Sequence, residues 1–217
     1  MIFDEEIPWP PKDAKLFINS GNKYKFSHFG WEGGIEAKFY GYMKGYKEAA
    51  DSLIENAVSS QDISKIDTVI YPVCFLYRQY LELVMKIIYL SYSEDTKEIK
   101  FNILKDINHS LIKIWNKIKP YLEEEANKDE LDDIKVVEEY IKQFHDFDRS
   151  SFTFRYPITK DLRNVISGQK RVNLPNLQVR MDELYHFFDG CIGKLDYSKE
   201  IKAEIRDEFK QFLNSEY

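Results

Sequence analysis

The chain has 217 residues, of which 43% are hydrophobic and 31% charged, and its net charge is −6 at neutral pH. This length and composition are typical of a globular protein with a substantial core and exclude a disordered chain. The acidic balance does not favour binding of nucleic acid by phosphate contacts alone, so an RNA-binding role requires a local basic patch. The first twelve residues are acidic, whereas a signal peptide begins with a basic region. We therefore expect a cytoplasmic protein with no membrane span.

The cysteines and histidines form no recognisable metal or disulfide motif. Cys74 and Cys191 are the only cysteines, and they are more typical of small core side chains than of a disulfide framework. The four histidines form no HxxxH or HExxH pair, and the glycine-containing runs lack the spacing of nucleotide-binding fingerprints. We expect no metal and no cofactor.

Residues 1–33 are rich in proline, glycine and aromatic residues. Two short runs, AKLFINS and NKYKFSHF, are joined by the turn signal Ser20-Gly21-Asn22, and each has the composition of a short strand. This segment is predicted to be an N-terminal arm that is irregular or contains a small amount of β-structure.

Residues 34–195 show apolar side chains spaced by three and four positions, which is typical of amphipathic helices. We expect a mainly α fold, an antiparallel bundle of four to six helices. A heavily charged helix outside the core is expected within residues 196–217. The predicted helices cover residues 35–58, 72–92, 107–120, 129–147, 175–188 and 198–213. The second is predicted to start near Pro72, the third to end or kink near Pro120, and the fifth to follow a cap at Asn173.

Two connections are predicted to be loops, and a third to contain a short β-like segment. Residues 58–67 and 93–100 are polar or charged and lack apolar periodicity. Within residues 151–172, aromatic and polar residues alternate as in a half-buried strand until Pro157. The turn signal Gly168-Gln169 then predicts a small hairpin.

The stretch Ile70–Tyr92 is apolar around almost its whole circumference, so this helix is predicted to be buried at the centre of the bundle. The exception is a stripe formed by Arg78, Glu82 and Lys86. Because these residues follow one another at intervals of four, they share one face of the helix.

Three further polar residues are expected near this stripe. His109 begins another helix, while Asp148 and Arg155 flank the strand-like segment. In one interpretation they form an ion-pair lock, in which Glu82 pairs with Arg78 or Arg155 and Asp148 pairs with another arginine. In the other, the converging cations and the histidine form a pocket for phosphate or a nucleotide.

Three runs, FLYRQYLELVMK, NHSLIKIW and DRSSFTFRYP, resemble bacterial proteins of the HEPN superfamily, over roughly residues 35–190. The resemblance implies an antiparallel bundle of four or five helices, often dimeric. Many HEPN proteins are metal-independent ribonucleases of toxin and phage-defence systems. Others have lost activity and act as interaction partners or nucleotide-binding modules.

The active signature of that superfamily is an arginine and a histidine separated by four to six residues. Arg180 and His186 in the run RMDELYH match this spacing, although Met181 stands where the family prefers a polar residue. In such a site the histidine takes the proton from an RNA 2′-hydroxyl, and the guanidinium stabilises the phosphorane. The alternative is an ordinary exposed histidine beside Asp182 and Asp189.

Two functions follow from these observations. The first is a dimeric, metal-independent endoribonuclease of a bacterial or phage defence or toxin system, with Arg180 and His186 as catalytic residues. The second is a non-catalytic HEPN-like module that binds a partner protein or a nucleotide. The first predicts an RNA substrate and a homodimer. In the second, the cluster around Arg78 serves stability or ligand binding.

Overall fold

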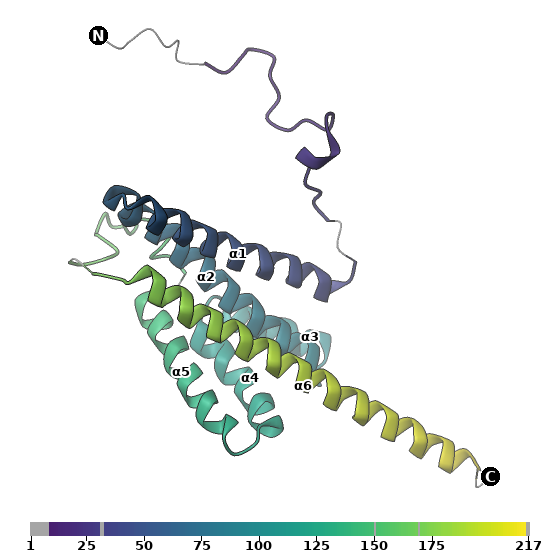
Figure 1. The fold of residues 1–217 in the computed structure, drawn as a ribbon. Coiled ribbons are helices and arrows are strands. Elements are labelled where there is room, and N and C mark those ends of the chain that lie inside the picture. Colours follow the sequence, from purple (N-terminus) through teal and green to yellow (C-terminus); the bar gives the residue numbers. More distant parts are fainter. Residues whose placement is uncertain (1–8, 31–32, 150, 169, 216–217) are drawn as a thin grey trace, which may run out of the picture. The chain divides into compact units, whose positions relative to one another are not determined.

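A computed structural model describes residues 9–30, 33–149, 151–168 and 170–215 (Figure 1). The chain divides into two compact units, Met1–Gly33 and Gly34–Tyr217. The described residues of the second unit form a bundle of α-helices, so the prediction of a mainly α fold is confirmed. Its helices are α1 (Ile35–Ser60), α2 (Ile63–Tyr92), α3 (Lys97–Ile107), α4 (Leu111–Glu125), α5 (Glu130–Phe147) and α6 (Leu174–Ser215).

The first unit contains no strand within its described residues, so the irregular form predicted for this arm is found and the small β-structure predicted as the alternative is not. Its only regular element is the short 3₁₀ helix η1 (Lys23–Lys25), and the Asn22 side chain accepts a hydrogen bond from the Tyr24 amide at 3.0 Å. Leu16 and Phe17 are 88% and 82% exposed. A two-stranded hairpin needs a buried apolar face, and these side chains do not supply one.

The break between α1 and α2 is much shorter than the loop predicted over residues 58–67. Gln61 adopts the left-handed conformation, with φ 53°, and ends α1. The Asp62 carboxylate then caps α2 by accepting from the amides of Ser64 and Lys65. Because the cap lies at Asp62, Pro72 falls inside α2 and not near its start.

The charged segment predicted as a loop over residues 93–100 contains the beginning of α3. Thr96 caps this helix by accepting from the Ile99 amide at 3.3 Å. Ile107 is buried, and Ile103 and Leu104 pack against the core. The next helix, α4, continues through Pro120 to Glu125, so of the two alternatives predicted near Pro120, an end or a kink, the end is wrong.

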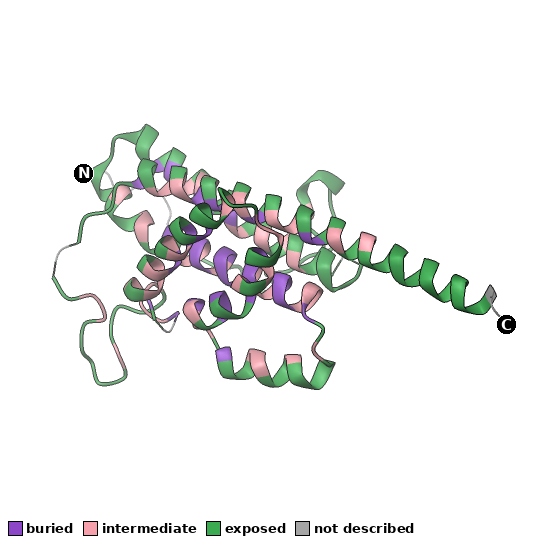
Figure 2. Cartoon of the chain, turned by 90° about the horizontal axis from the view of Figure 1, so that it is seen from below, coloured by how far each residue is buried: buried purple, intermediate pink, exposed green. Residues whose placement is uncertain are grey.

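The helix α6 is continuous where two separate helices were predicted. The Asn173 side chain accepts from the Asn176 amide at 3.0 Å, which confirms the predicted cap at its start. The helix then runs through Gly190 and Gly193 without a break, since buried Phe188 and Leu195 hold it against the bundle on both sides. Beyond Ile201 its described side chains are exposed (Figure 2).

The connection between α5 and α6 contains turns instead of the predicted hairpin. The amides of Arg155 and Tyr156 both donate to the Phe152 carbonyl, which makes a turn of the residues predicted as a strand. The described part of this connection has a single isolated β-bridge, between Ile158 and Asn164. Gln169, half of the predicted turn signal, lies outside the described residues.

The helix α2 forms the centre of the bundle, as its apolar circumference predicted. It packs against α1, α4 and α6, and the side chains of Tyr77, Leu81 and Ile88 are fully buried (Figure 2). Trp115 of α4 and Phe188 of α6 meet edge to face, with ring centroids 6.4 Å apart. None of the described helices is long and apolar enough to cross a membrane.

Candidate functional site

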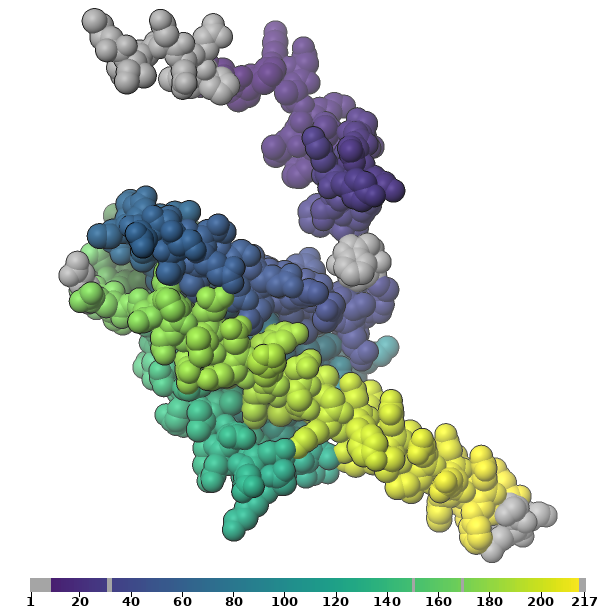
Figure 3. All heavy atoms as spheres, viewed as in Figure 1, coloured from purple at the N-terminus to yellow at the C-terminus, as the bar shows by residue number. Residues whose placement is uncertain are grey.

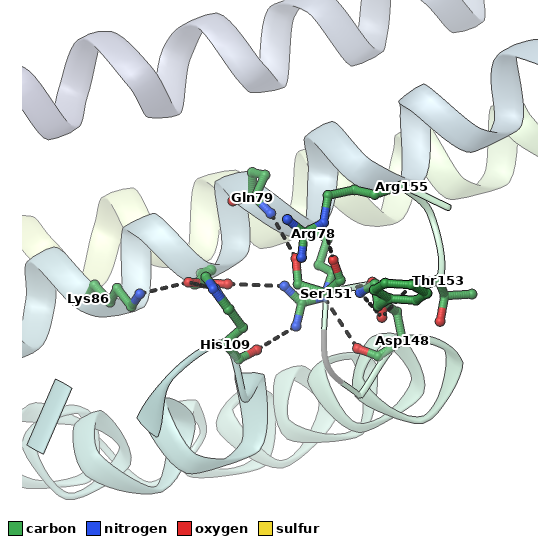
Figure 4. Close-up of polar contacts among 10 residues, drawn as sticks. Arg78, Gln79, Lys86, His109, Asp148, Ser151, Thr153 and Arg155 are labelled. Atoms are coloured by element: carbon green, nitrogen blue, oxygen red, sulfur yellow. Dashed lines mark hydrogen bonds and ion pairs between the residues drawn. The ribbon is translucent and has the colours of Figure 1, made fainter. Parts of the chain in front are cut away.

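The stripe on α2 lies at the centre of a buried polar cluster (Figure 4). The Arg78 side chain is 0% exposed, and its Nη1 lies 3.0 Å from Glu82 Oε2. Its Nε lies 3.3 Å from the Asp148 carboxylate and also donates to the Asp148 carbonyl. Its Nη2 donates to the His109 carbonyl. All three nitrogens of the guanidinium are therefore engaged by acceptors within the protein.

Glu82 connects the same cluster to two further groups. Its Oε1 accepts from Lys86 Nζ at 2.7 Å and lies 2.9 Å from His109 Nδ1. Burial raises the pKa of Glu82, but the hydrogen bonds and charges of Lys86 and His109 outweigh this effect and lower it overall. Glu82 therefore stays ionised and pairs with the buried Arg78.

Asp148 ties the cluster to the connection that follows α5. Its Oδ1 accepts from the amides of Phe152 and Thr153, at 2.9 and 3.1 Å. Arg155 is more distant from the centre: its Nε donates to the Ser151 carbonyl (Figure 4). The six residues therefore do not share one set of ion pairs.

The geometry of the cluster is that of a lock between α2, the start of α4 and the connection after α5. Glu82 pairs with Arg78, and Asp148 pairs with the same arginine instead of another one. Arg155 makes no ion pair with either carboxylate among the described residues. Each nitrogen of Arg78 already contacts an acceptor within the protein and the side chain is fully buried, so the arrangement fits the lock better than the nucleotide pocket.

Arg180 and His186 lie on α6 but do not converge. Six positions on an α-helix correspond to a rotation of about 120° and a rise of about 9 Å, so the two side chains leave the helix in different directions. The Arg180 guanidinium pairs with Glu183 at 2.9 Å and donates to the Tyr140 hydroxyl at 3.4 Å. His186 is exposed, and its ring meets the Tyr185 ring edge to face.

Each of these residues lines a different hollow. His186 borders a hollow of about 200 Å³ between α6, the end of α4 and the start of α5, together with Glu125, Asp133 and Lys194. Arg180 borders a hollow of about 340 Å³ between α5, α6 and the connection that joins them. One copy of the chain therefore does not assemble the catalytic pair that the resemblance implies.

The sequence did not point to a larger cleft of about 740 Å³ beside the first half of α2, which we call the α2 cleft. Its rim carries Asp67 and Tyr71 from α2 and Lys170 and Arg171 from the connection before α6. The remaining lining residues are mainly apolar: Ile66, Ile70, Cys74, Phe147, Phe154, Ile166, Gly168, Val172 and Leu174.

The rim of the α2 cleft combines two cations with aromatic rings. Lys170 Nζ lies 4.3 Å from the centroid of the Phe147 ring, which in turn stacks on Phe154 with centroids 5.3 Å apart. Arg171 is exposed and makes no ion pair or hydrogen bond with any described residue. Such a rim favours an anion, and the apolar interior favours a flat or aliphatic group attached to it.

Cys74 lies at the base of the α2 cleft and is 6% exposed. Burial raises the pKa of its thiol to about 12, so the thiol stays protonated. A neutral, buried thiol is a poor nucleophile, and Cys74 acts here as a small apolar side chain.

Among the described residues, no group of three or more His, Cys, Asp or Glu side chains is placed to hold a metal ion. Comparison with family models, curated proteins and solved structures finds no match for this chain.

Proposed function

We propose that the chain is a non-catalytic, HEPN-like binding module whose ligand is an anionic aromatic compound of the nucleotide class. The observation that carries the proposal is the α2 cleft, in which Arg171 is free to pair with a phosphate. A volume of about 740 Å³ is in the range of small-molecule sites, which cover roughly 300–1,000 Å³.

The rim offers a distinct contact for each part of such a ligand. Arg171 and Lys170 supply charge-assisted donors for the phosphate. Tyr71 is 51% exposed and presents a ring on which a base can stack, while the Asp67 carboxylate, one helical turn away, can accept an N–H from the base. The base and the phosphate would then lie on opposite sides of the cleft.

The test is isothermal titration of the full chain with AMP and, separately, with uncharged adenosine. We expect AMP to bind with a stoichiometry of one. The Arg171→Gln variant should bind AMP about tenfold more weakly, because one charge-assisted hydrogen bond contributes about 1.5 kcal/mol or more. Its binding of adenosine should not change.

Arg206→Gln is the matched control, since it removes the same charge from the exposed end of α6, where Arg206 pairs with the exposed Glu94. An equal loss of AMP affinity in both variants would show that the change in net charge, and not a contact with Arg171, causes the effect. Absence of AMP binding by the unaltered chain would refute the proposal.

A second candidate, the dimeric endoribonuclease, is supported by the state of His186. Its imidazole is exposed and forms no hydrogen bond within the described residues, so it is available to take a proton. Because Arg180 of the same copy leaves α6 in another direction, this function needs two copies that join their sites across a two-fold axis. Incubation of the chain with total RNA in EDTA tests it. Fragments ending in a cyclic phosphate from the unaltered chain, but not from His186→Ala, are the expected result.

A further inference from the structure

A separate hollow of about 240 Å³ is lined by residues of α1, α2 and α6. Figure 3 shows the face on which α1 and α6 lie side by side. Four tyrosines line this hollow, which we call the tyrosine pocket: Tyr40, Tyr80, Tyr92 and Tyr185.

Tyr80 has an unsatisfied hydroxyl in the tyrosine pocket. Its side chain is 2% exposed, yet its hydroxyl makes no hydrogen bond with any described residue. Other tyrosines of α2 behave differently: the hydroxyls of Tyr77, Tyr89 and Tyr92 each donate to an aspartate, at 2.6, 2.8 and 2.7 Å. The Tyr80 hydroxyl is therefore available to water or to a ligand that enters the pocket.

The Tyr80 hydroxyl is directed into the pocket and not into the core. The fully enclosed side-chain atoms without a hydrogen bond, among the described residues, are nitrogens of Trp115, His145 and Arg180. The Tyr80 hydroxyl is not one of them, so the small exposed part of this side chain includes its oxygen. Burial raises the pKa of Tyr80, and so to a lesser extent do Tyr185 and Asp189, which line the same pocket.

The charges around the pocket select against anions. Three carboxylates line it, those of Glu36, Asp189 and Asp196, and Lys44 is the one cation among its lining residues. Lys44 is already paired with Glu48 at 3.7 Å. Asp189 is exposed and has no ion pair or hydrogen bond with the described part of the chain, so its carboxylate is free to accept one.

The tyrosine rings add a further attraction for cations. Lys44 lies over the Tyr40 ring, at 5.8 Å from its centroid, and Lys199 lies over the Tyr92 ring at 5.7 Å. No described cation lies over Tyr80, whose ring packs against Tyr185 with centroids 6.2 Å apart. The faces of such rings attract ammonium and guanidinium groups.

We propose that the tyrosine pocket binds a small organic cation, an alkylammonium or guanidinium group that donates N–H bonds to the Asp189 carboxylate and the Tyr80 hydroxyl. The volume of about 240 Å³ fits one such head group with a short aliphatic chain, and the side chains of Val84, Ile87 and Ile88 supply apolar contacts for that chain. The cation can be a free amine or the side chain of lysine or arginine in a peptide.

The experiment is isothermal titration of the full chain with butylguanidinium and with butylurea, its uncharged analogue of the same shape. We expect butylguanidinium to bind with a stoichiometry of one and butylurea to bind at least tenfold more weakly. Equal binding of the two compounds, or binding of neither, would overturn the proposal.

Two variants test whether butylguanidinium binds in the tyrosine pocket. Tyr80→Phe removes only the hydroxyl and should weaken butylguanidinium binding about three- to tenfold. Asp189→Asn should weaken it about two- to fivefold, the range for one partly exposed ion pair. Glu208→Gln makes the same charge change on the exposed end of α6 and should leave the affinity unchanged. Unaltered affinity in both pocket variants, or an equal loss in Glu208→Gln, would overturn the assignment.

A third ligand distinguishes the two sources of the cation. An acetylated and amidated tripeptide with a central arginine presents the same guanidinium on a peptide backbone. Tighter binding of this peptide than of butylguanidinium would support a protein side chain as the ligand, and tighter binding of butylguanidinium would support a free amine.

Discussion

Arg78 and Glu82 form an ion pair one helical turn apart on α2, with Nη1 3.0 Å from Oε2, and both side chains are buried. Bringing two charges out of water costs several kcal/mol per ion, so such a pair persists only when its other hydrogen-bonding atoms are also satisfied. Asp148 and the His109 carbonyl satisfy the remaining guanidinium nitrogens. The ion pair on α2 therefore depends on contacts with two segments that are distant in the sequence, those that contain His109 and Asp148.

Replacement of Arg78 by methionine should lower the free energy of unfolding by about 3–5 kcal/mol, because the buried Asp148 carboxylate loses its cation and Glu82 loses one of its partners. Urea denaturation measures this change. The additional replacement Asp148→Asn should recover part of the loss, since it removes the buried charge that is left without a cation. Arg149→Met is the matched control. The Arg149 side chain is 75% exposed beside Asp146, so a change below about 0.5 kcal/mol is expected. A loss below about 1 kcal/mol for Arg78→Met would contradict the lock.

Acidification should weaken the same cluster through Glu82. Its pKa in the folded protein lies below the ordinary value of 4.5, because Lys86 and His109 outweigh the opposite effect of burial. A carboxylate with a lowered pKa contributes stability above its unfolded pKa, and this stability is lost as the pH falls through the folded pKa. The free energy of unfolding should thus decrease more steeply below about pH 4.5 in the unaltered chain than in Glu82→Gln. Parallel pH profiles in urea would refute this role of Glu82.

The sequence predicted the local part of this cluster but not its tertiary contacts. The spacing of Arg78, Glu82 and Lys86 places them on one helical face whatever the fold, because helical periodicity is a local property. The contact of Arg78 with Asp148 joins α2 to the end of α5, and no spacing within the sequence specifies it. The candidate pairing of Glu82 with Arg155 was equally compatible with the sequence.

Helix ends were predicted less well than the helices, for a related reason. Pro120 and Gly190 are weak helix formers, and local propensity alone places an end near each of them. Packing overrides that preference, since Leu122 and Leu195, which follow them, are buried in the core. The sequence did not predict the α2 cleft, because Lys170 and Arg171 lie on an irregular connection. No periodicity in the sequence specifies that this connection brings them to the same cleft as residues of α2.

The hydroxyl of Tyr77 should stabilise the fold through its hydrogen bond to Asp51. It donates to Asp51 Oδ1 at 2.6 Å, and the side chain is 0% exposed. Tyr77→Phe should lower the free energy of unfolding by about 1.5 kcal/mol, the lower range for a hydrogen bond to a charged group. Tyr80→Phe removes a hydroxyl without a partner on the same helix, so its effect on stability should be below about 0.5 kcal/mol. Equal losses in the two variants would show that the hydrogen bond to Asp51 is not the cause.

Gly193 should be a site where alanine stabilises α6. A methyl group at this position would have no atom within 4 Å, so substitution causes no clash. Glycine in a helix interior costs about 1 kcal/mol relative to alanine, and Gly193→Ala should raise the free energy of unfolding by about this amount.

Gly168→Ala is the matched control for that change. Its Cβ would also meet nothing within 4 Å, but Gly168 has a φ of +73°, which strains any side chain. Here alanine should lower the free energy of unfolding by about 1 kcal/mol, since the left-handed conformation is unfavourable for it. Urea denaturation compares the two variants. Because neither substitution creates a contact, opposite signs would isolate the backbone conformation as the cause. A loss of stability in Gly193→Ala would instead indicate that α6 is interrupted between residues 188 and 198, where the sequence alone predicted a break between two helices.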